Sequence, residues 1–213
     1  MSETIIPPKN MFLVRFIAFT FGIIFRLYFR MRYKLGMDFG KKDRPAIIVF
    51  NHTSHLDPLL IALCLGVKYA KDIVPFGKKE LFQGGLMTWI VRGLGGFPVD
   101  RDTLDVSAAR AIMTILKEGG TILLAPEGTR SLTGEVQPFN NGFIKMAMKA
   151  KALILPVGIK GAYEALPKGV SIPRPYKIAV NFGDFIDLSS QPRSADIDAL
   201  AEAVRQTIIR LKG

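Results

Sequence analysis

The sequence predicts a single-domain α/β fold in which helices flank a mixed, largely parallel sheet. Short β-branched runs alternate with helical segments over most of the chain, which is typical of strands joined by crossover helices. Polar stretches directly follow two of these runs, and sites in open α/β sheets usually form at the carboxyl ends of strands. With 213 residues, 49% of them hydrophobic, the chain can bury one sizeable core. We expect an N-terminal helical segment at residues 1–40 and one domain at residues 41–213.

Residues 11–33 form the most apolar long stretch and contain no helix breaker apart from Gly22. A spanning helix needs about 20 predominantly apolar residues, yet only ten uncharged residues separate Arg15 from Arg26. On a helix these two arginines lie about 20° apart, with Arg30 about 60° from Arg15. An arginine in mid-span costs about 2.5–3.5 kcal/mol, whereas an in-plane helix keeps its arginines at the lipid headgroups. We predict an amphipathic membrane-surface helix, and a helix packed only on the core is the alternative.

The elements of the domain follow in regular alternation. Seven apolar runs are expected strands: residues 32–35, 46–50, 72–76, 97–101, 121–125, 153–159 and 177–182. Helices are expected at residues 58–67, around Met87, Trp89 and Ile90, and at residues 103–117, 141–150 and 195–211. Prolines 167, 173 and 175 mark an irregular stretch before the last strand.

The polar octet Asn51–Pro58, with the sequence NHTSHLDP, directly follows the expected strand 46–50 and contains both histidines of the chain. Because Pro suits the first position of a helix, Asp-Pro places His52 in a strand-to-helix turn. His52 is a candidate general base, since histidine titrates near neutral pH. Asp57, five residues later, is a candidate to orient His52 and stabilise its protonated form.

Two other interpretations of the octet remain open on the residues alone. Ser54 or Asp57 can cap the helix that follows. Alternatively, His52, His55 and Asp57 could supply three ligands to the metal ion of a hydrolase. The chain has one Cys and no further His, so any additional ligands would have to be carboxylates.

A second polar stretch, Pro126–Ser131, follows the expected strand 121–125. Gly128 permits close backbone approach to a ligand, and its N–H group is a candidate to stabilise an oxyanion. The guanidinium group of Arg130 presents a fork that suits phosphate oxygens. A plain polar loop with a solvated arginine is the alternative.

The net charge of +11 favours anionic partners: phosphorylated substrates, anionic lipid or nucleic acid. Nine basic and three acidic side chains precede residue 46, so +6 of this charge lies before the octet. Aromatic side chains gather in the apolar N-terminal stretch instead of alternating with Lys and Arg, which argues against nucleic-acid binding. The single cysteine, Cys64, excludes an internal disulfide and is expected to fill the core of a protein in a reducing compartment.

Four blocks of the chain, in order, resemble those of the glycerolipid acyltransferases, the family of 1-acyl-glycerol-3-phosphate acyltransferases. Residues 51–58 resemble the NHxSxxDP block, and residues 97–101, FPVDR, resemble the second block. Residues 126–131 match the PEGTRS block, and residues 155–157, LPV, resemble the fourth. The blocks have family-like spacing, and the range that they span, residues 51–157, is about half of the chain.

The resemblance implies a glycerolphosphate acyltransferase-like fold and a reaction. An acyl group would move from acyl-CoA or acyl carrier protein to the free hydroxyl of lysophosphatidic acid, which gives phosphatidic acid in phospholipid synthesis. We expect no cofactor and no metal ion. The partners would be the phosphorylated lysolipid acceptor, the acyl thioester donor and an anionic membrane surface at the cytoplasmic face of the cell membrane.

The resemblance also assigns roles to residues of this chain. It implies that His52 is the general base and Asp57 its partner. It implies that Arg101 contacts the acceptor phosphate and that Lys78, in a Gly-Lys-Lys-Glu-Leu stretch, is a further phosphate contact. The remaining substrate-binding residues would be Glu127, Gly128, Thr129 and Arg130, while Pro156 and Val157 would be structural or line the donor side.

Two alternatives concern the reaction itself. A sister activity would acylate glycerol-3-phosphate or another lysophospholipid. A covalent acyl-enzyme is disfavoured because Cys64 falls in an apolar helix and no serine lies in a nucleophile-elbow pattern. We therefore predict direct transfer within a ternary complex.

Overall fold

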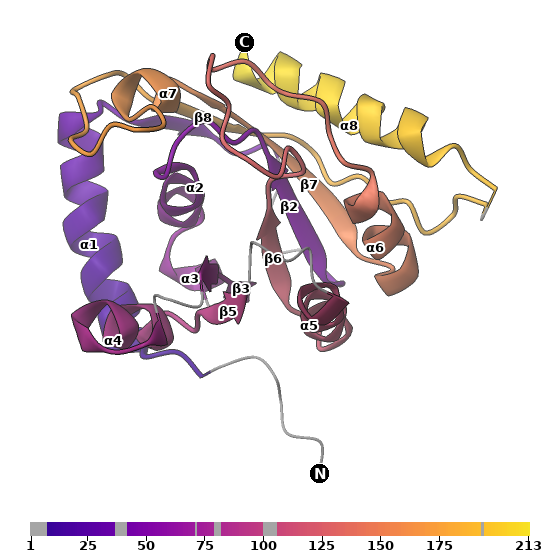
Figure 1. Ribbon diagram of the computed structural model, residues 1–213, viewed down its shortest axis with the longest axis horizontal. Coiled ribbons are helices and arrows are strands. Elements are labelled where there is room, and N and C mark those ends of the chain that lie inside the picture. Colours follow the sequence, from indigo (N-terminus) through magenta and orange to yellow (C-terminus); the bar gives the residue numbers. More distant parts are fainter. Residues whose placement is uncertain (1–7, 37–41, 71, 79–81, 100–105, 193) are drawn as a thin grey trace.

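The computed structural model describes residues 8–36, 42–70, 72–78, 82–99, 106–192 and 194–213. One sheet runs through its centre, with six strands in the order β1-β8-β7-β2-β6-β3 (Figure 1). Its strands are β1 (Arg32–Lys34), β2 (Ala46–Phe50), β3 (Ile73–Val74), β6 (Thr121–Leu124), β7 (Leu153–Lys160) and β8 (Ala179–Phe182). Neighbouring strands are parallel except β7 and β8, which are antiparallel. The predicted mixed, largely parallel sheet is confirmed.

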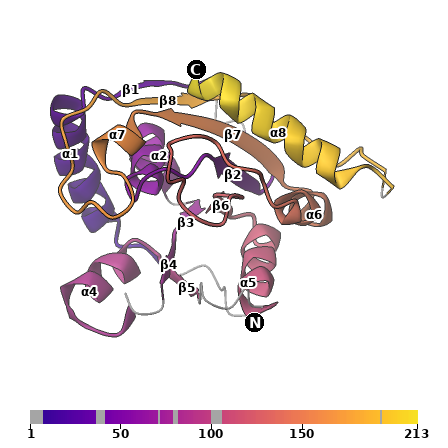
Figure 2. The ribbon, with the colours of Figure 1, turned by 45° about the horizontal axis from the view of Figure 1, so that its top comes forward.

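Helices cover both faces of this sheet (Figures 1 and 2). One face carries α1 (Met11–Tyr28) and α2 (Asp57–Leu65), and the other carries α5 (Val106–Lys117), α6 (Gly142–Ala150) and α8 (Ile197–Lys212). Three shorter or peripheral helices are α3 (Val67–Ala70), α4 (Gly85–Gly93) and α7 (Ala162–Ala165). A separate parallel pair is formed by β4 (Phe76–Lys78) and β5 (Phe97–Val99).

Strand β2 lies at the centre of the fold, and all five of its residues are buried. Successive side chains of a strand point to opposite faces. Ile48 and Phe50 therefore pack in the core beneath α1 and α2, while Ile47 and Val49 pack in the core beneath α5, α6 and α8. A strand that is buried on both faces reads as a continuous apolar run, which is why the sequence identifies this strand at its correct bounds.

The position of β2 between β6 and β7 brings the predicted functional stretches together. Val49 pairs with Leu124 of β6 on one side and with Pro156 of β7 on the other. Because these strands are parallel, their carboxyl ends lie at one edge of the sheet. The octet that follows β2 and the loop that follows β6 therefore begin side by side.

Helix α1 is attached to the domain along one side. The Oδ1 atom of Asn10 accepts from the Leu13 N–H at 3.1 Å and caps the helix, while the Asn10 N–H donates to the Gly93 carbonyl of α4 at 2.8 Å. Leu13, Val14 and Phe25 of α1 are buried. Helix α1 therefore packs on the domain through a narrow stripe.

The rest of α1 presents apolar side chains to the surface. Phe12 is 80% exposed, Leu27 75% and Phe19 70%. Within the described ranges α1 is the one helix whose length and composition would allow it to cross a membrane, and 17% of that stretch is buried. A helix packed only on the core would not leave so broad an apolar face uncovered.

Some element boundaries differ from those expected. Helix α1 ends at Tyr28 rather than near residue 33, so the predicted position of Arg30 on the helix face is wrong. Arg30 adopts φ of 46°, a left-handed turn that stops the helix before β1. Residues 58–67 are divided into α2 and α3 at Gly66, whose φ is 73°.

The expected strand 72–76 is divided between two sheets. Residues 73–74 form β3 at the edge of the main sheet, and residues 76–78 form β4. Pro75 lies between them and lacks the N–H group needed to continue a ladder. Helix α7 has no counterpart among the expected elements because four residues are too few for a periodic pattern. The expected division near residue 40 lies outside the described residues and stays a prediction.

Candidate active site

His52 and Asp57 meet in the turn between β2 and α2. The Nδ1 atom of His52 lies 3.0 Å from Oδ2 of Asp57, so the contact between the two side chains that the sequence predicts is present. The His52 side chain is 16% exposed and the Asp57 side chain is fully buried. The His52 ring also packs edge-on against Phe50, with 5.8 Å between ring centres. This pair offers a partly accessible imidazole backed by a buried carboxyl group.

Backbone groups of the turn also converge on the Asp57 carboxyl group. Its Oδ2 atom accepts from the N–H of Thr53 at 2.7 Å and from the N–H of Ser54 at 2.8 Å. These donors precede Asp57, and no side chain caps the start of α2. Asp57 therefore closes the turn between β2 and α2 and does not cap its helix, so the helix-cap interpretation of Asp57 is wrong.

The hydrogen bonds also determine the protonation pattern of the pair. Burial raises the pKa of Asp57, while the hydrogen bonds from His52, Ser54 and Thr53 oppose this rise. Because Oδ2 of Asp57 already serves as the acceptor for the N–H groups of Thr53 and Ser54, we assign it as the acceptor toward His52 as well, which places the imidazole proton on Nδ1. The Nε2 atom then carries the lone pair, which is the state that a general base requires.

The backbone of His52 is held from both sides by the loop that follows β6. The His52 N–H donates to Oε1 of Glu127 at 3.0 Å. The Ser131 N–H donates to the His52 carbonyl at 2.8 Å. Glu127, which the family resemblance places among the substrate-binding residues, thus contacts the turn that holds His52.

Burial raises the pKa of Glu127 to about 7, and hydrogen bonds from the backbone of His52 and Gln137 act in the opposite direction. Its second oxygen, Oε2, is buried and has no hydrogen-bond partner among the described residues. A carboxyl group in this environment is easier to protonate than an exposed one. The folded state therefore binds a proton at Glu127 more tightly than the unfolded chain does.

Glu127→Gln is expected to increase stability relative to the unmodified protein more at pH 8 than at pH 5. In the unfolded chain a glutamate has a pKa of about 4.3, whereas the pKa of Glu127 in the fold is about 7. As the pH rises from about 4.3 to about 7, ionisation of Glu127 therefore lowers the free energy of unfolding. Above the higher pKa this loss is complete. Urea unfolding midpoints at the two pH values measure this. The matched control is Glu164→Gln at an exposed position of α7; an equal pH dependence in both variants would contradict the prediction.

Three further polar residues position the site, although the sequence interpretation gave Ser54 only as a possible helix cap and assigned no role to Asn51 or Ser131. The buried amide of Asn51 donates to the Ile159 carbonyl at 2.9 Å and accepts from the Ile159 N–H at 2.8 Å. The Ser54 hydroxyl donates to the Leu166 carbonyl at 2.8 Å. Together with Ser131 these residues tie the turn to β7, to α7 and to the loop after β6. The signal in the sequence that could have identified these residues is their location inside the two polar stretches 51–58 and 126–131.

The loop after β6 turns at Gly128. Its φ is 72°, and an added Cβ would meet nothing within 4 Å, so the backbone conformation rather than crowding requires glycine here. The Gly128 N–H donates to the Ala125 carbonyl at 3.1 Å. This N–H group is therefore engaged within its own turn, and the expectation that it stabilises an oxyanion stays a prediction.

The structure describes the predicted phosphate-binding residues to different extents. Arg130 is half-buried, and within the described part of the chain no hydrogen bond or ion pair holds its guanidinium group. Thr129, beside it, is exposed. The backbone of Lys78 ends β4 and pairs with Val99 of β5. Arg101 lies outside the described residues, two positions after the end of β5.

The metal interpretation of the octet finds no geometric support. Among the residues described, no group of three or more His, Cys, Asp or Glu side chains could hold a metal ion. The Oδ2 atom of Asp57 already accepts three hydrogen bonds, from His52, Thr53 and Ser54. The other carboxyl oxygen, Oδ1, has no hydrogen-bond partner among the described residues, but His52, His55 and Asp57 do not form a ligand set in this arrangement.

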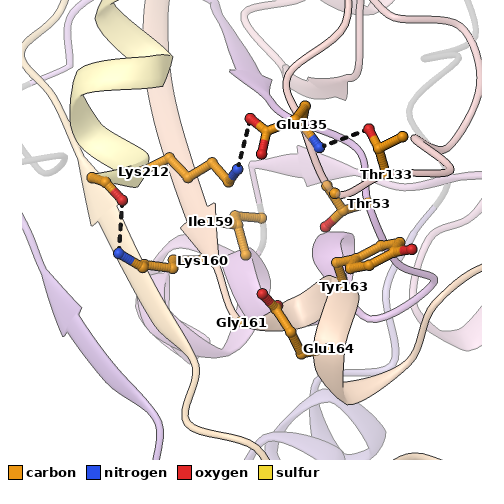
Figure 3. Close-up of a pocket in the computed structure, with 11 residues that line it drawn as sticks. Thr53, Thr133, Glu135, Ile159, Lys160, Gly161, Tyr163, Glu164 and Lys212 are labelled. Atoms are coloured by element: carbon orange, nitrogen blue, oxygen red, sulfur yellow. Dashed lines mark hydrogen bonds and ion pairs between the residues drawn. The ribbon is translucent and has the colours of Figure 1, made fainter.

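A polar cavity of about 260 Å³ adjoins the turn at Thr53 (Figure 3). Lys212 lies 3.7 Å from Glu135, and the Lys160 ammonium group donates to the Gly213 carbonyl at 2.7 Å. The two lysines and the two glutamates that line the cavity balance in charge. Nothing in this lining favours a phosphate group over a neutral ligand.

Comparisons with known proteins place this geometry in context. The acyltransferase family model matches residues 34–160, which is more than half of the chain. The 1-acyl-sn-glycerol-3-phosphate acyltransferase of Bacillus subtilis (strain 168) is 30% identical over 184 residues, covering 82% of this chain and 86% of that protein. The 1-acyl-sn-glycerol-3-phosphate acyltransferase of Streptococcus pneumoniae (strain ATCC BAA-255 / R6) is 30% identical over 173 residues, covering 80% of this chain and 61% of that protein.

A solved structure is similar as well. The crystal structure of the 1-acyl-sn-glycerophosphate (LPA) acyltransferase from Thermotoga maritima superposes with a TM-score of 0.72 and 26% sequence identity. The match covers 96% of this chain and 81% of that chain. The similarity therefore extends over nearly all of the fold, beyond the polar blocks on which the family resemblance was based.

Proposed function

Because this chain belongs to the acyltransferase family, we propose that it transfers an acyl group from a thioester donor to the free hydroxyl of lysophosphatidic acid, giving phosphatidic acid. The observation that carries the proposal is the His52–Asp57 pair, with 3.0 Å between Nδ1 and Oδ2, at the carboxyl end of the central strand. The curated relatives described above act on 1-acyl-sn-glycerol-3-phosphate by name. The enzyme would serve phospholipid synthesis.

In the proposed reaction, Nε2 of His52 takes the proton from the acceptor hydroxyl as its oxygen attacks the thioester carbonyl. An alcohol is a weak nucleophile, so a positioned base is useful and typically contributes about 10²–10⁴ in rate. Asp57 keeps the Nδ1 proton in place and stabilises the imidazolium that forms. The collapse of the tetrahedral intermediate breaks the C–S bond, and the proton passes from His52 to the departing sulfur. The products are an ester and a thiol.

Direct transfer is preferred to a covalent acyl-enzyme. Cys64 is buried in α2, and burial raises the pKa of its thiol to about 12. The nucleophile of a cysteine enzyme is the thiolate, which this environment disfavours. Both substrates would therefore be bound together, as the sequence predicts.

For the acceptor phosphate we propose the half-buried Arg130 as the main contact, because a guanidinium group can pair with two phosphate oxygens at once. Lys78 and Arg101 would be further phosphate contacts, as the family resemblance implies. Gly128 and Thr129 would provide close backbone approach beside Arg130. Glu127 would act chiefly by holding the His52 backbone, with which it shares a hydrogen bond.

The donor would be acyl-CoA or acyl carrier protein. The reaction as written consumes only acceptor and donor, and no step needs a metal ion or a redox cofactor.

We place the enzyme at the cytoplasmic face of the cell membrane, because its acceptor is a lipid and α1 exposes a broad apolar face. On that helix Arg15 and Arg26 are also exposed, where they can reach anionic headgroups. No nucleic-acid partner is proposed.

The proposed function is tested by product analysis with purified protein. We expect phosphatidic acid when lysophosphatidic acid is offered with acyl-CoA or acyl carrier protein. Arg130→Ala is expected to raise the KM for lysophosphatidic acid about 10- to 100-fold, since a hydrogen bond to a charged group contributes about 1.5–3 kcal/mol. Mass spectrometry of the products and steady-state kinetics provide the measurements.

Arg110→Ala, at an exposed position of α5, is the matched control for the loss of an arginine. Glycerol-3-phosphate and lysophosphatidylcholine are offered in parallel as acceptors. Faster turnover of either one would assign the sister activity in place of the proposed one. An unchanged KM in Arg130→Ala would remove Arg130 from the acceptor site while leaving the reaction itself in place.

A further inference from the structure

Most of the exposed large apolar side chains in the described part of the chain lie on a few neighbouring segments. Of the fourteen large hydrophobic residues that are exposed in the described ranges, eight lie on α1, two in residues 33–35, one on α4 and two in residues 166–177. Only Leu132 lies elsewhere. A scattered set would need no explanation, but a concentrated one marks an interaction surface.

Residues 166–177, here called the basic loop, combine an apolar tip with positive charge. Ile172 is 79% exposed and Tyr176 is 46% exposed. Lys168, Arg174 and Lys177 are all exposed, and the loop contains no acidic residue. Apolar side chains flanked by Lys and Arg are the composition of segments that bind anionic membrane surfaces.

The basic loop lies against the end of α1 (Figures 1 and 2). The Tyr28 hydroxyl donates to the Pro173 carbonyl at 2.8 Å. After α1, the Arg32 N–H donates to the Ile178 carbonyl at 2.9 Å, and the Ile178 N–H donates to the Phe29 carbonyl at 3.1 Å. These bonds hold the loop and the exposed face of α1 together as one continuous surface.

We propose that the basic loop, together with the exposed face of α1, docks the enzyme on an anionic lipid bilayer. The charge of the loop complements anionic headgroups, and Ile172 would enter the interface beside the apolar side chains of α1. This inference rests on the proposed function and deepens it by assigning the surface from which the lipid acceptor is reached.

The basic loop is also connected to the catalytic turn. The Leu166 carbonyl, at the start of the loop, accepts from the hydroxyl of buried Ser54 at 2.8 Å. The Arg174 N–H returns to the Ala165 carbonyl at 2.7 Å and closes the loop at its base. Docking through this loop would therefore fix the orientation of the His52 turn relative to the membrane.

The test is sedimentation of the full chain with vesicles of phosphatidylcholine and phosphatidylglycerol. A basic residue near an anionic surface contributes about 1 kcal/mol, so the double variant Lys168→Glu with Arg174→Glu should bind about 30-fold more weakly or worse. Ile172→Ser should weaken binding about tenfold through loss of buried apolar area. The matched controls are Lys117→Glu with Lys149→Glu, which makes the same charge change on exposed sites of α5 and α6, and Leu132→Ser.

Binding of the loop variants that equals that of their controls would overturn the proposal, as would an unmodified protein that does not bind the vesicles. Concentration-dependent mass in light scattering that the loop variants abolish would assign the surface to a second copy of the chain instead. Turnover of a short-chain lysophosphatidic acid in solution is measured in parallel. Loop variants that retain turnover but lose vesicle binding would support the docking role. If the unmodified protein shows no turnover, the proposed function is contradicted, but the vesicle-binding result can still be interpreted by itself.

Discussion

His52→Ala is expected to lower kcat by about 10²–10⁴ and to leave the protein folded. The variant removes the only atom of the pair that can take the acceptor proton, Nε2. Its effect on the fold should be small, because the Oδ2 atom of Asp57 keeps its hydrogen bonds from the N–H groups of Thr53 and Ser54. Phosphatidic acid formation under saturating substrates measures kcat, and urea unfolding measures stability.

His55→Ala is the matched control because His55 is exposed and lies in the same turn. It should retain kcat within about twofold of the unmodified enzyme, and chelator treatment should leave both proteins unaffected. Near-normal turnover by His52→Ala would refute the proposed mechanism. Equal losses in both histidine variants, with sensitivity to chelator, would favour the metal-dependent hydrolase that the residues alone left open.

Substitution of Asp57 is expected to affect both activity and stability, and two variants separate these effects. Asp57→Ala leaves His52 Nδ1 and the N–H groups of Thr53 and Ser54 without their acceptor in a buried turn. Since an unsatisfied buried donor costs about 1–3 kcal/mol, we expect a loss of several kcal/mol in the free energy of unfolding. Asp57→Asn retains an oxygen acceptor and should keep most of this stability.

Asp57→Asn should nevertheless lower kcat by about 10²–10⁴, because a neutral amide neither stabilises the imidazolium nor holds the proton on Nδ1 as a carboxylate does. The matched control is Asp196→Asn, whose carboxyl group accepts from the N–H groups of Asp198 and Ala199 at the start of α8. That variant should lose some stability and retain kcat. Full activity in Asp57→Asn would reduce Asp57 to a structural acceptor of the turn.

The proposed roles of α1 and the catalytic turn are physically related. The substrate of the proposed reaction is a lipid, so the enzyme must approach a bilayer with a defined orientation. Phe25 of α1 and Phe29, which caps the end of that helix, belong to the same buried cluster as Phe50 at the end of β2. The surface that would touch the membrane and the strand that precedes His52 thus share one core.

The sequence alone predicted most of the elements because their patterns are local. Strand β2 is buried on both faces and reads as an uninterrupted apolar run, so its bounds are correct. The helices at 142–150 and 197–212 lie within one or two residues of their expected limits. The predicted bounds of helices and strands were wrong where a single residue changed the direction of the backbone. These residues are Arg30 with φ of 46°, Gly66 with φ of 73°, and Pro75.

Within the site, the sequence determined that His52 and Asp57 can meet, because a separation of five residues in a turn is short enough for side-chain contact. In the structure, Nδ1 of His52 and Oδ2 of Asp57 are 3.0 Å apart. Only the tertiary structure decided what surrounds them. Glu127 reaches the His52 N–H, and Asn51 reaches Ile159, across 75 and 108 positions of sequence. Those partners depend on β2 lying between β6 and β7 in register, and strand order is a property of the assembled sheet that no local pattern encodes.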